Sequence, residues 1–396
     1  MHLFTDELNR RLADLREQNL FRELRQVDSA QGPHIESGGK SWLNFSSNDY
    51  LGLANHPALK NAAIQSVARF GAGAGASRLI CGSLAPFHEL EQALAAFKQT
   101  EAALTFATGF AAAGAISALA GKDDIVILDK LVHACIVDAA RLSGATLRVF
   151  AHNDLSDLEE KLKWSQTKAQ AEAGKRKAAI LVITESVFSM DGDRAPLLEM
   201  VQLKEKYGAW LMVDEAHATG ILGQNGRGLI DALGLSQRVE IQMGTLGKAL
   251  GASGGYICGS RALIDFLVNR ARSFIFSTAP VPAAAAAAAA GIQVAQSAEG
   301  ETRRQQLLSR ITEWKAQLKT NRANPGAAII PLLVGEEEAA LAVAKTLRDQ
   351  DIFVPAIRYP TVARGAARLR ITLTAGHTAA DVAALITAVK TLNLTA

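Results

Sequence analysis

The chain has 396 residues, of which 49% are hydrophobic and 20% charged, and its formal net charge is +3 at pH 7. This composition is typical of a soluble globular protein of about two domains. So small a net charge gives no reason to expect binding to nucleic acid or to an acidic membrane surface. Cys81, Cys135 and Cys258 form no disulfide framework and match no zinc motif. We therefore expect a reducing compartment, the cytoplasm, and no metal.

Membrane insertion is also disfavoured by the sequence. The N-terminal segment is charged and helix-forming, without the apolar core of a signal peptide. Residues 102–121 carry no charge but contain several Gly, Ser and Thr, and residues 281–290 are mostly alanine. Because Leu, Ile, Phe and Val dominate membrane spans, we interpret both stretches as buried or half-buried parts of a soluble fold.

Seven short apolar runs, most of them continuous rather than alternating, predict strands that are covered on both faces. They lie at residues 103–106, 124–128, 146–150, 180–184, 210–214, 240–244 and 255–258. Helical patterns separate most of them, for example at residues 155–171 and 197–207. This alternation predicts an α/β fold with a mostly parallel sheet and helices on both faces. The short runs near 245–260 predict one antiparallel strand at an edge.

The pattern changes after about residue 280. An alanine-rich helix and a charged helix at 301–319 lead into a smaller α+β pattern. It contains strands at 328–333, 353–357 and 369–373, a helix through Thr346 and a last helix from Thr378. We therefore predict an N-terminal helix and arm (1–45), a large domain (46–280) and a small C-terminal domain (281–396).

Lys248 and Asp214 are the first candidates for chemistry. Lys248 lies in a glycine-rich loop after a predicted strand, and such a loop lets the backbone approach a flat ligand. A lysine amine forms a Schiff base with an aldehyde. Asp214 ends the strand at 210–214, where open α/β sheets bind ligands. Taken singly, a surface lysine and an N-cap aspartate remain open alternatives.

Other polar residues lie at or just beyond predicted strand ends. His133 follows the strand at 124–128, and His217 follows Asp214 by three residues. The segment Thr108–Phe110 opens a helix whose first N–H groups suit a phosphate, although alone it is a weak motif. Residues 214–217 also spell a helicase box, but the P-loop that an ATPase needs is absent.

Together, these residues resemble the α-oxoamine synthases, enzymes of the aspartate-aminotransferase fold that use pyridoxal 5'-phosphate (PLP). The motifs are Asn44–Leu53, Ser186–Gly192, Val213–His217, Thr245–Lys248 and the segment around Arg370. They follow one another across almost the whole chain. The resemblance implies fold type I, with a mostly parallel sheet in the large domain and a smaller α+β C-terminal domain. The chain departs from the family at Glu215, where a second aspartate is usual, and at Ala113, where asparagine often stands.

The resemblance implies a catalytic set of Lys248, His133, Asp214 and His217. Lys248 would hold PLP as a Schiff base, Asp214 would pair with the pyridine nitrogen, and His133 would stack on the ring. Ser189 and His217 would surround the phenolic oxygen.

The resemblance also implies a cofactor pocket that two subunits share. Gly109, Phe110 and Thr245 would belong to it within one chain. Ser277 or Thr278 would reach the phosphate of the neighbouring subunit's cofactor, so we expect a homodimer.

Within the family, the motifs at 44–53, 150–154 and 355–374 resemble synthases that join L-alanine to pimeloyl-CoA, or to a pimeloyl carrier-protein thioester, with loss of CO2. The loop at 245–255 instead resembles ligases that use glycine and acetyl-CoA, which stays an alternative. A PLP-fold binding or regulatory module, the non-enzymatic alternative, should lack Lys248 or carry an added DNA-binding domain. The expected substrate contacts are Arg22, Asn48, His133, Arg358, Thr361 and Arg370.

Among these contacts, Arg358 is inferred from chemistry. A pimeloyl thioester carries a distal carboxylate that needs a cationic partner, whereas an acetyl group needs none. A solvated surface arginine is the equally ordinary alternative.

Overall fold

The computed structural model describes residues 2–171, 178–318 and 328–392, and these form two compact units. The larger unit comprises Asp49–Ser189 and Asp193–Gln305. The smaller unit comprises Met1–Asn48, Met190–Gly192 and Gln306–Ala396. The expected boundary after residue 45 lies close to the division after Asn48.

The expected boundary after residue 280 precedes helix α12 (Pro282–Gln296), which the division assigns to the larger unit. The physical reason is packing, because α12 contacts α2 (Pro57–Phe70) and α3 (Ala85–Lys98). The alanines of α12 allow this close approach of helix to helix, and Ala285 and Ala288 are buried.

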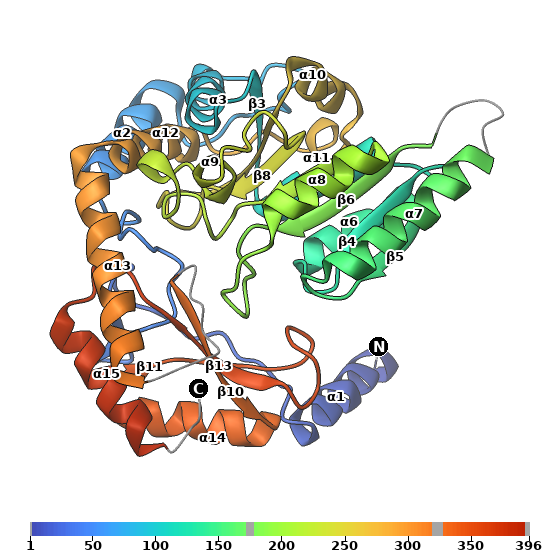
Figure 1. Cartoon of the computed structure of the whole chain (residues 1–396). Coiled ribbons are helices and arrows are strands. Elements are labelled where there is room, and N and C mark those ends of the chain that lie inside the picture. Colours follow the sequence, from blue (N-terminus) through green and yellow to red (C-terminus); the bar gives the residue numbers. More distant parts are fainter. Residues whose placement is uncertain (1, 172–177, 319–327, 393–396) are drawn as a thin grey trace. The chain divides into compact units, whose positions relative to one another are not determined.

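A seven-stranded sheet forms the centre of the larger unit (Figure 1). In spatial order its strands are β3 (Ala102–Phe106), β9 (Gly255–Gly259), β8 (Ile241–Thr245), β7 (Trp210–Asp214), β6 (Ile180–Glu185), β4 (Ile125–Asp129) and β5 (Thr146–Phe150). All residues of β3, β4, β6 and β9 are buried, as their continuous apolar runs predict. All seven predicted strands are present, shifted by at most one residue at either end.

Strand β9 runs antiparallel to both of its neighbours, β3 and β8. The prediction of one antiparallel strand is therefore confirmed, but its expected place at the edge is wrong. With partners on both sides, β9 satisfies its buried N–H and C=O groups along its whole length. The edge belongs to β3, which α3 and α10 (Arg261–Arg270) cover.

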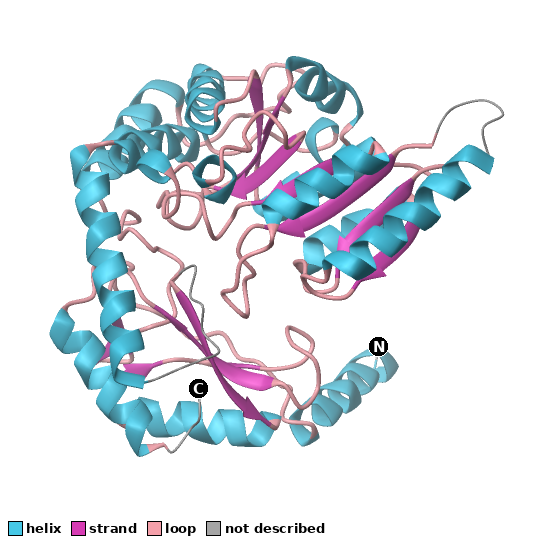
Figure 2. Cartoon of the chain, viewed as in Figure 1, coloured by secondary structure: helices cyan, strands magenta, loops and turns pink. Residues whose placement is uncertain are grey.

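Figure 2 shows helices beside the strands of the larger unit. Along the sequence, helices separate most of these strands. Helices α7 (Leu155–Ala171) and α8 (Leu197–Tyr207) have the predicted bounds and pack on β4, β5, β6 and β7. The uncharged segment after Thr108 forms two short helices, α4 (Gly109–Ala113) and α5 (Ile116–Leu119). The remaining elements are α6 (Ala134–Ser143), η1 (Gln224–Gly226), α9 (Leu229–Ala232) and α11 (Arg272–Ile275).

The smaller unit contains two three-stranded sheets. One is formed by β1 (His34–Ser37), β2 (Lys40–Asn44) and β11 (Ile352–Phe353), the other by β10 (Ile329–Gly335), β13 (Ala367–Thr372) and β12 (Ala356–Ile357). The single strand predicted at 353–357 is thus two short strands in different sheets. Pro355 lies between them and has no N–H to donate to a ladder.

Helices complete the smaller unit. They are α1 (His2–Glu17), the end of α13 (Ala298–Leu318), α14 (Glu337–Arg348) and α15 (Ala379–Thr391). Thr378 and Asp381 form a capping box that starts α15 where the sequence predicts. Across the described parts of the chain, every helix is too short or too polar to cross a membrane.

Candidate active site

Polar residues collect where neighbouring parallel strands of the larger unit end. Asp214 ends β7, and Glu185 ends β6 directly opposite it in the register. Thr245 ends β8, and Lys248 follows three residues later. Because parallel strands place their carboxyl ends at one edge, the topology itself brings these side chains together.

Lys248 is part of a chain of three side chains. Its Nζ lies 2.9 Å from Nε2 of His217, and Nδ1 of the same ring lies 2.6 Å from the hydroxyl oxygen of Tyr50. His217 is buried, and contacts at both ring nitrogens fix the orientation of the imidazole. Tyr50 was not anticipated. It lies inside the Asn44–Leu53 motif, but nothing in the local pattern marks it as a partner of His217.

Asp214 is a buried carboxylate with few donors around it. Its Oδ1 accepts a hydrogen bond of 2.8 Å from the amide of Ala216, the one hydrogen bond to this carboxylate among the described residues. Burial raises the pKa of Asp214, whereas the charge of Lys248 lowers it. A buried carboxylate with one neutral donor is stabilised by a further cationic partner.

Glu185 connects two of the expected site residues. Its Oε1 accepts the amide N–H of His133 at 2.5 Å, and its carboxylate also accepts the amide N–H of Ser189. Burial and the nearby Asp214 charge raise the pKa of Glu185 to about 8. Glu185 was missed because the predicted strand ended one residue too early, at Thr184. Its position beside Asp214 in the register was the available signal.

His133 lies at the amino end of α6, where it is the N-cap residue. Its Nδ1 accepts a hydrogen bond of 3.2 Å from the amide of Cys135, while the ring itself is exposed. Partial burial lowers the pKa of His133, although the charge of Asp214 raises it. The residue therefore offers the face of a neutral imidazole close to Asp214 and Lys248.

Thr245 shapes the loop that carries Lys248. Its Oγ1 donates to the carbonyl of Gly254 at 2.9 Å and accepts the amide of Gly247 at 3.2 Å. Gly109 lies beside it, because a Cβ there would be 3.7 Å from Cβ of Thr245. A side chain at Gly255 would come within 2.7 Å of Cα of Gly109, so this glycine is required for the approach.

Phe110 follows Gly109 and exposes its ring. The expected residues Lys248, His217, Asp214, His133, Ser189, Thr245, Gly109 and Phe110 are thus gathered at the strand ends, and we call them, with Glu185 and Tyr50, the Lys248 cluster.

Ser277 and Thr278 lie elsewhere in the larger unit. Thr278 forms a β-bridge with Ser77, and the next residue, Ala279, donates its amide to the carbonyl of Ala76. Among the described residues, no hydrogen bond joins them to the Lys248 cluster. Their expected contact with a neighbouring subunit's cofactor stays a prediction.

Two expected substrate residues form a pair in the smaller unit. Arg370 lies on β13 and is buried, and its Nη1 donates to Oδ1 of Asn48 at 3.1 Å and to the hydroxyl of Thr372 at 3.0 Å. The side chain of Asn48 therefore helps to orient a guanidinium that suits a carboxylate.

Arg22, Arg358 and Thr361 form a second group in the smaller unit. Nη2 of Arg22 donates to the carbonyl of Tyr359 at 2.9 Å, and the amide of Thr361 donates to the carbonyl of Arg358 at 3.0 Å. Arg358 is buried rather than solvated, and it donates to the carbonyls of Asn19 and Phe21. It thus anchors the arm that carries Arg22, and its contact with the acyl group stays a prediction.

Known proteins with a similar sequence or structure show the class to which this fold belongs. The chain belongs to the aminotransferase class I and II family, whose model matches residues 40–389. The predicted fold class is thereby confirmed, and its closely similar solved structures include serine palmitoyltransferase from S. paucimobilis (TM-score 0.88, 29% identity, 98% of this chain and 96% of that one).

Within this class, the chain is similar to proteins named 8-amino-7-oxononanoate synthase. It shares 45% identity over 393 residues with the one from Geotalea daltonii, covering 98% of this chain and 97% of the relative. The solved structure of the Francisella tularensis 8-amino-7-oxononanoate synthase matches with a TM-score of 0.73 and 28% identity, over 89% of this chain and 98% of that one.

Proposed function

We propose that the protein is a PLP-dependent acyltransferase of biotin biosynthesis. It condenses L-alanine with pimeloyl-CoA, or with a pimeloyl carrier-protein thioester, and releases 8-amino-7-oxononanoate, the free thiol and CO2. One observation carries the proposal. The amine of Lys248 contacts His217 beside a buried Asp214 at the strand ends, in a chain that matches named synthases over nearly its full length.

The Lys248 cluster fits PLP. Lys248 would hold the aldehyde covalently, and the buried carboxylate of Asp214, which has one backbone donor, would accept the proton of the pyridine nitrogen. The exposed ring of His133 would stack on the cofactor ring. Thr245 and the first N–H groups of α4 would lie at its phosphate, because unpaired helix N–H groups favour anions. Structures of the similar serine palmitoyltransferase hold PLP.

When bound, PLP supplies an aldehyde for the amino group of alanine and a ring that delocalises the electrons released at Cα. Lys248 moves the Cα proton, and the imidazole of His217 at 2.9 Å holds the amine in position and exchanges protons with it. Asp214 would hold a negative charge for the ring nitrogen of the cofactor. The new bond would join Cα to the thioester carbonyl as the C–S bond breaks, and the thiol would leave with a proton. CO2 would then depart from Cα, and Cα would take up a proton in its place.

The smaller unit supplies arginines for the two carboxylates of the substrates. Arg370, oriented by Asn48, would bind the alanine carboxylate. Arg22 and Thr361 would contact the acyl half, with Arg358 as candidate partner of its distal carboxylate. A site with these cations suits a dicarboxylic acyl group better than an acetyl group or a long alkyl chain.

The proposal includes a homodimer in the cytoplasm. The turn at Ser277 and Thr278 is partly exposed, so a partner's cofactor phosphate has access to it. Cys81, Cys135 and Cys258 are free thiols, as expected in a reducing compartment.

The test is a thiol-release assay with the purified holoenzyme. Alanine, glycine and serine are combined with pimeloyl-, acetyl- and palmitoyl-CoA, and the product is identified by mass. The highest kcat/KM is expected for alanine with pimeloyl-CoA. Preference for glycine with acetyl-CoA would replace the proposal with the ligase activity that the loop at 245–255 suggests. No thiol release with any pair would refute acyl transfer.

A further inference from the structure

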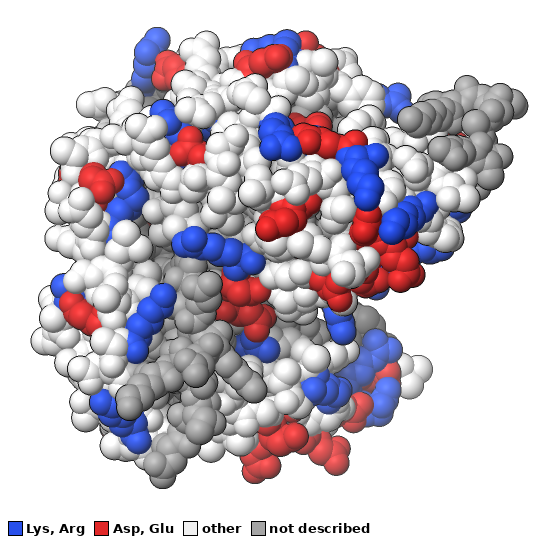
Figure 3. Space-filling model, in the orientation of Figure 1, with Lys and Arg blue, Asp and Glu red and all other residues white. Residues whose placement is uncertain are grey.

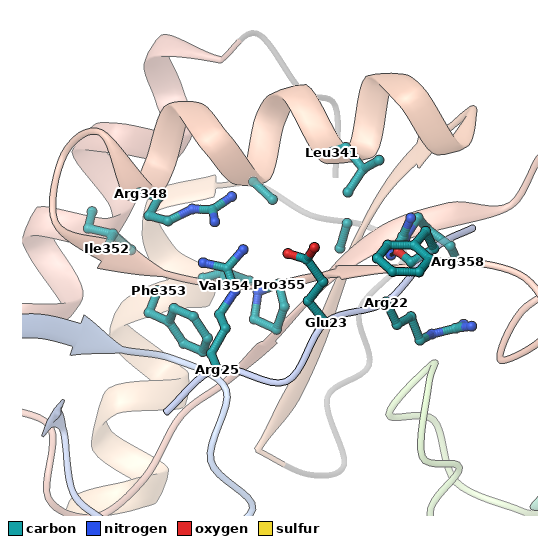
Figure 4. A pocket seen from close by; sticks show the side chains of 13 residues that line it. Arg22, Glu23, Arg25, Leu341, Arg348, Ile352, Phe353, Val354, Pro355 and Arg358 are labelled. Atoms are coloured by element: carbon teal, nitrogen blue, oxygen red, sulfur yellow. Dashed lines mark hydrogen bonds between the residues drawn. The ribbon is translucent and has the colours of Figure 1, made fainter. Parts of the chain in front are cut away.

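A pocket of about 470 Å³ lies within the smaller unit, and none of the Lys248 cluster lines it. Its walls come from the N-terminal arm, α14 and the segment from β11 to β12. Four arginines line it, Arg22, Arg25, Arg348 and Arg358, against one acidic residue, Glu23 (Figure 4). We call it the arginine pocket.

These arginines lack the carboxylate partners that several other arginines of the molecule have. Within the described residues, none of the four forms an ion pair, and Glu23 forms none with them. By contrast, Arg238 pairs with Glu205 at 2.6 Å and Arg303 pairs with Glu299 at 2.7 Å. On the face drawn in Figure 3, basic and acidic side chains are interspersed. The pocket therefore gathers four cations, whose charge is offset only in part by Glu23 in the lining and by Asp349 and Glu337 at longer range.

Among the four arginines, Arg22 and Arg358 donate side-chain hydrogen bonds to backbone carbonyls, which distinguishes them from Arg25 and Arg348. Both guanidinium groups extend into the same space, with the carboxylate of Glu23 pointing up beside them (Figure 4). Neither guanidinium group makes a hydrogen bond within the part of the chain that the structure describes. Burial lowers the pKa of Arg348, and the nearby charge of Arg25 lowers it further, although the charge of Asp349 raises it. The two cations therefore repel each other.

Local structure explains only one of these two positions. Arg348 is the last residue of α14, where the helix dipole favours a cation. Arg25 belongs to the extended arm and gains nothing from a helix. The arm is held in place by Arg358, which donates to the carbonyls of Asn19 and Phe21. The arm thus brings Arg25 close to a like charge, which is favourable when an anion binds between them.

We propose that one end of the arginine pocket binds the phosphates of the CoA thioester, with Arg25 and Arg348 as their principal ligands. Arg22 and Arg358 lie apart from this pair in Figure 4 and are not among these ligands. The inference rests on the proposed function and adds a subsite to it. The pocket has the volume of a small-molecule site, which favours a nucleotide over the flat surface of an acidic carrier protein. The ring of Phe353 and the ring of Pro355 provide an apolar wall for the adenine.

The first test separates the phosphates from the acyl group. The Arg25→Ala/Arg348→Ala holoenzyme is assayed with pimeloyl-CoA and with pimeloyl-pantetheine, which has the same thioester but no phosphate. The KM for pimeloyl-CoA should rise about tenfold or more, since hydrogen bonds to charged groups contribute at least that factor. The KM for pimeloyl-pantetheine and for alanine should not change. Lys345→Ala is the matched control, because Lys345 is an exposed cation of the same helix that does not line the pocket.

The outcomes distinguish this inference from the proposed function. An unmodified enzyme that makes no product from alanine and pimeloyl-CoA would refute the function. An active enzyme whose double variant keeps the KM for pimeloyl-CoA would refute the subsite alone. Equal losses with both thioesters would also refute it, because they would show a general disturbance of the arm.

A second test measures binding without turnover. Adenosine 3′,5′-bisphosphate, which carries phosphates of CoA without the acyl arm, is titrated calorimetrically into the holoenzyme. Binding should weaken about tenfold in the double variant and with rising salt, because the contact is between charges. Binding of inorganic phosphate but not of the bisphosphate would show an adventitious ion only and overturn the proposal.

Discussion

The Lys248 cluster and the arginine pocket are both polar sites, but they balance charge in opposite ways. In the Lys248 cluster, Lys248 contacts His217, and its charge stabilises the carboxylates of Asp214 and Glu185 at the ends of buried strands. In the arginine pocket, Arg25 and Arg348 repel each other on an arm and at a helix end. The first site is organised by the fold, whereas the second is complete only with an anionic ligand.

The largest effect is expected at Lys248. Lys248→Ala should reduce thiol release by at least about a thousandfold, because no other lysine at the site replaces its amine. Borohydride treatment of the unmodified holoenzyme should fix a pyridoxyl label, located by peptide mass mapping, on Lys248. Lys206→Ala, which removes an exposed lysine, should remain active. A label on any other lysine would contradict the assignment.

The two carboxylates of the Lys248 cluster, Asp214 and Glu185, should differ in their effect on activity. Asp214→Asn removes a charge that the ring nitrogen needs, and kcat/KM should fall by roughly a hundred- to a thousandfold. Glu185→Gln should cost much less, because burial and Asp214 raise the pKa of Glu185 to about 8 and hold it largely neutral at pH 7. Equal losses in the two variants would show that both carboxylates act by packing alone.

A substitution at Arg358 tests whether this residue recognises the distal carboxylate of the acyl group. If Arg358 binds the distal carboxylate, Arg358→Ala should raise the KM for pimeloyl-CoA by roughly ten- to a hundredfold. The KM for heptanoyl-CoA, which has the same chain length without that carboxylate, should then remain constant. If both constants rise together, Arg358 serves only to hold the arm at Asn19 and Phe21.

Tyr50 should have a smaller effect through His217. Tyr50→Phe removes the hydroxyl 2.6 Å from Nδ1 of His217, and kcat should fall roughly threefold to tenfold, the value of one hydrogen bond. The pH profile of kcat should shift as well, because the hydroxyl fixes the tautomer of His217. Tyr256→Phe, whose hydroxyl meets Thr219 instead, should leave that profile in place.

The smallest effect concerns His152, outside both sites. Burial lowers its pKa, but the carboxylates of Asp129 and Asp193, at 2.9 and 2.8 Å, outweigh burial and raise it from an ordinary 6.5 to about 10. Its stabilising contribution should be complete below pH 6.5 and be lost as the pH rises through about 10.

The Tm of His152→Ala, followed by scanning fluorimetry, should accordingly lie about 2–4 °C below that of the unmodified protein at pH 6. The difference should shrink above pH 10. His34→Ala, at a mostly exposed histidine, serves as the control. A difference that grows with pH would show that the ring acts through packing alone.

The strands and the residues that end them could be predicted from the sequence alone. Continuous apolar runs specify buried strands because both faces must leave water, and this information is local. The same local pattern is therefore enough to place Lys248, Asp214 and His217 at or just beyond strand ends. The resemblance to a family supplied their expected roles.

Contacts between residues far apart in the sequence became known only from the tertiary structure. Strand β9 lies between β3 and β8 because backbone pairing on both sides satisfies its buried groups, which no local pattern reveals. Tyr50 reaches His217 across 167 positions of the chain, and Arg25 of the N-terminal arm meets Arg348 of α14 in one pocket. Such contacts depend on how the chain closes its long loops, so their partners are absent from the local sequence that a periodicity describes.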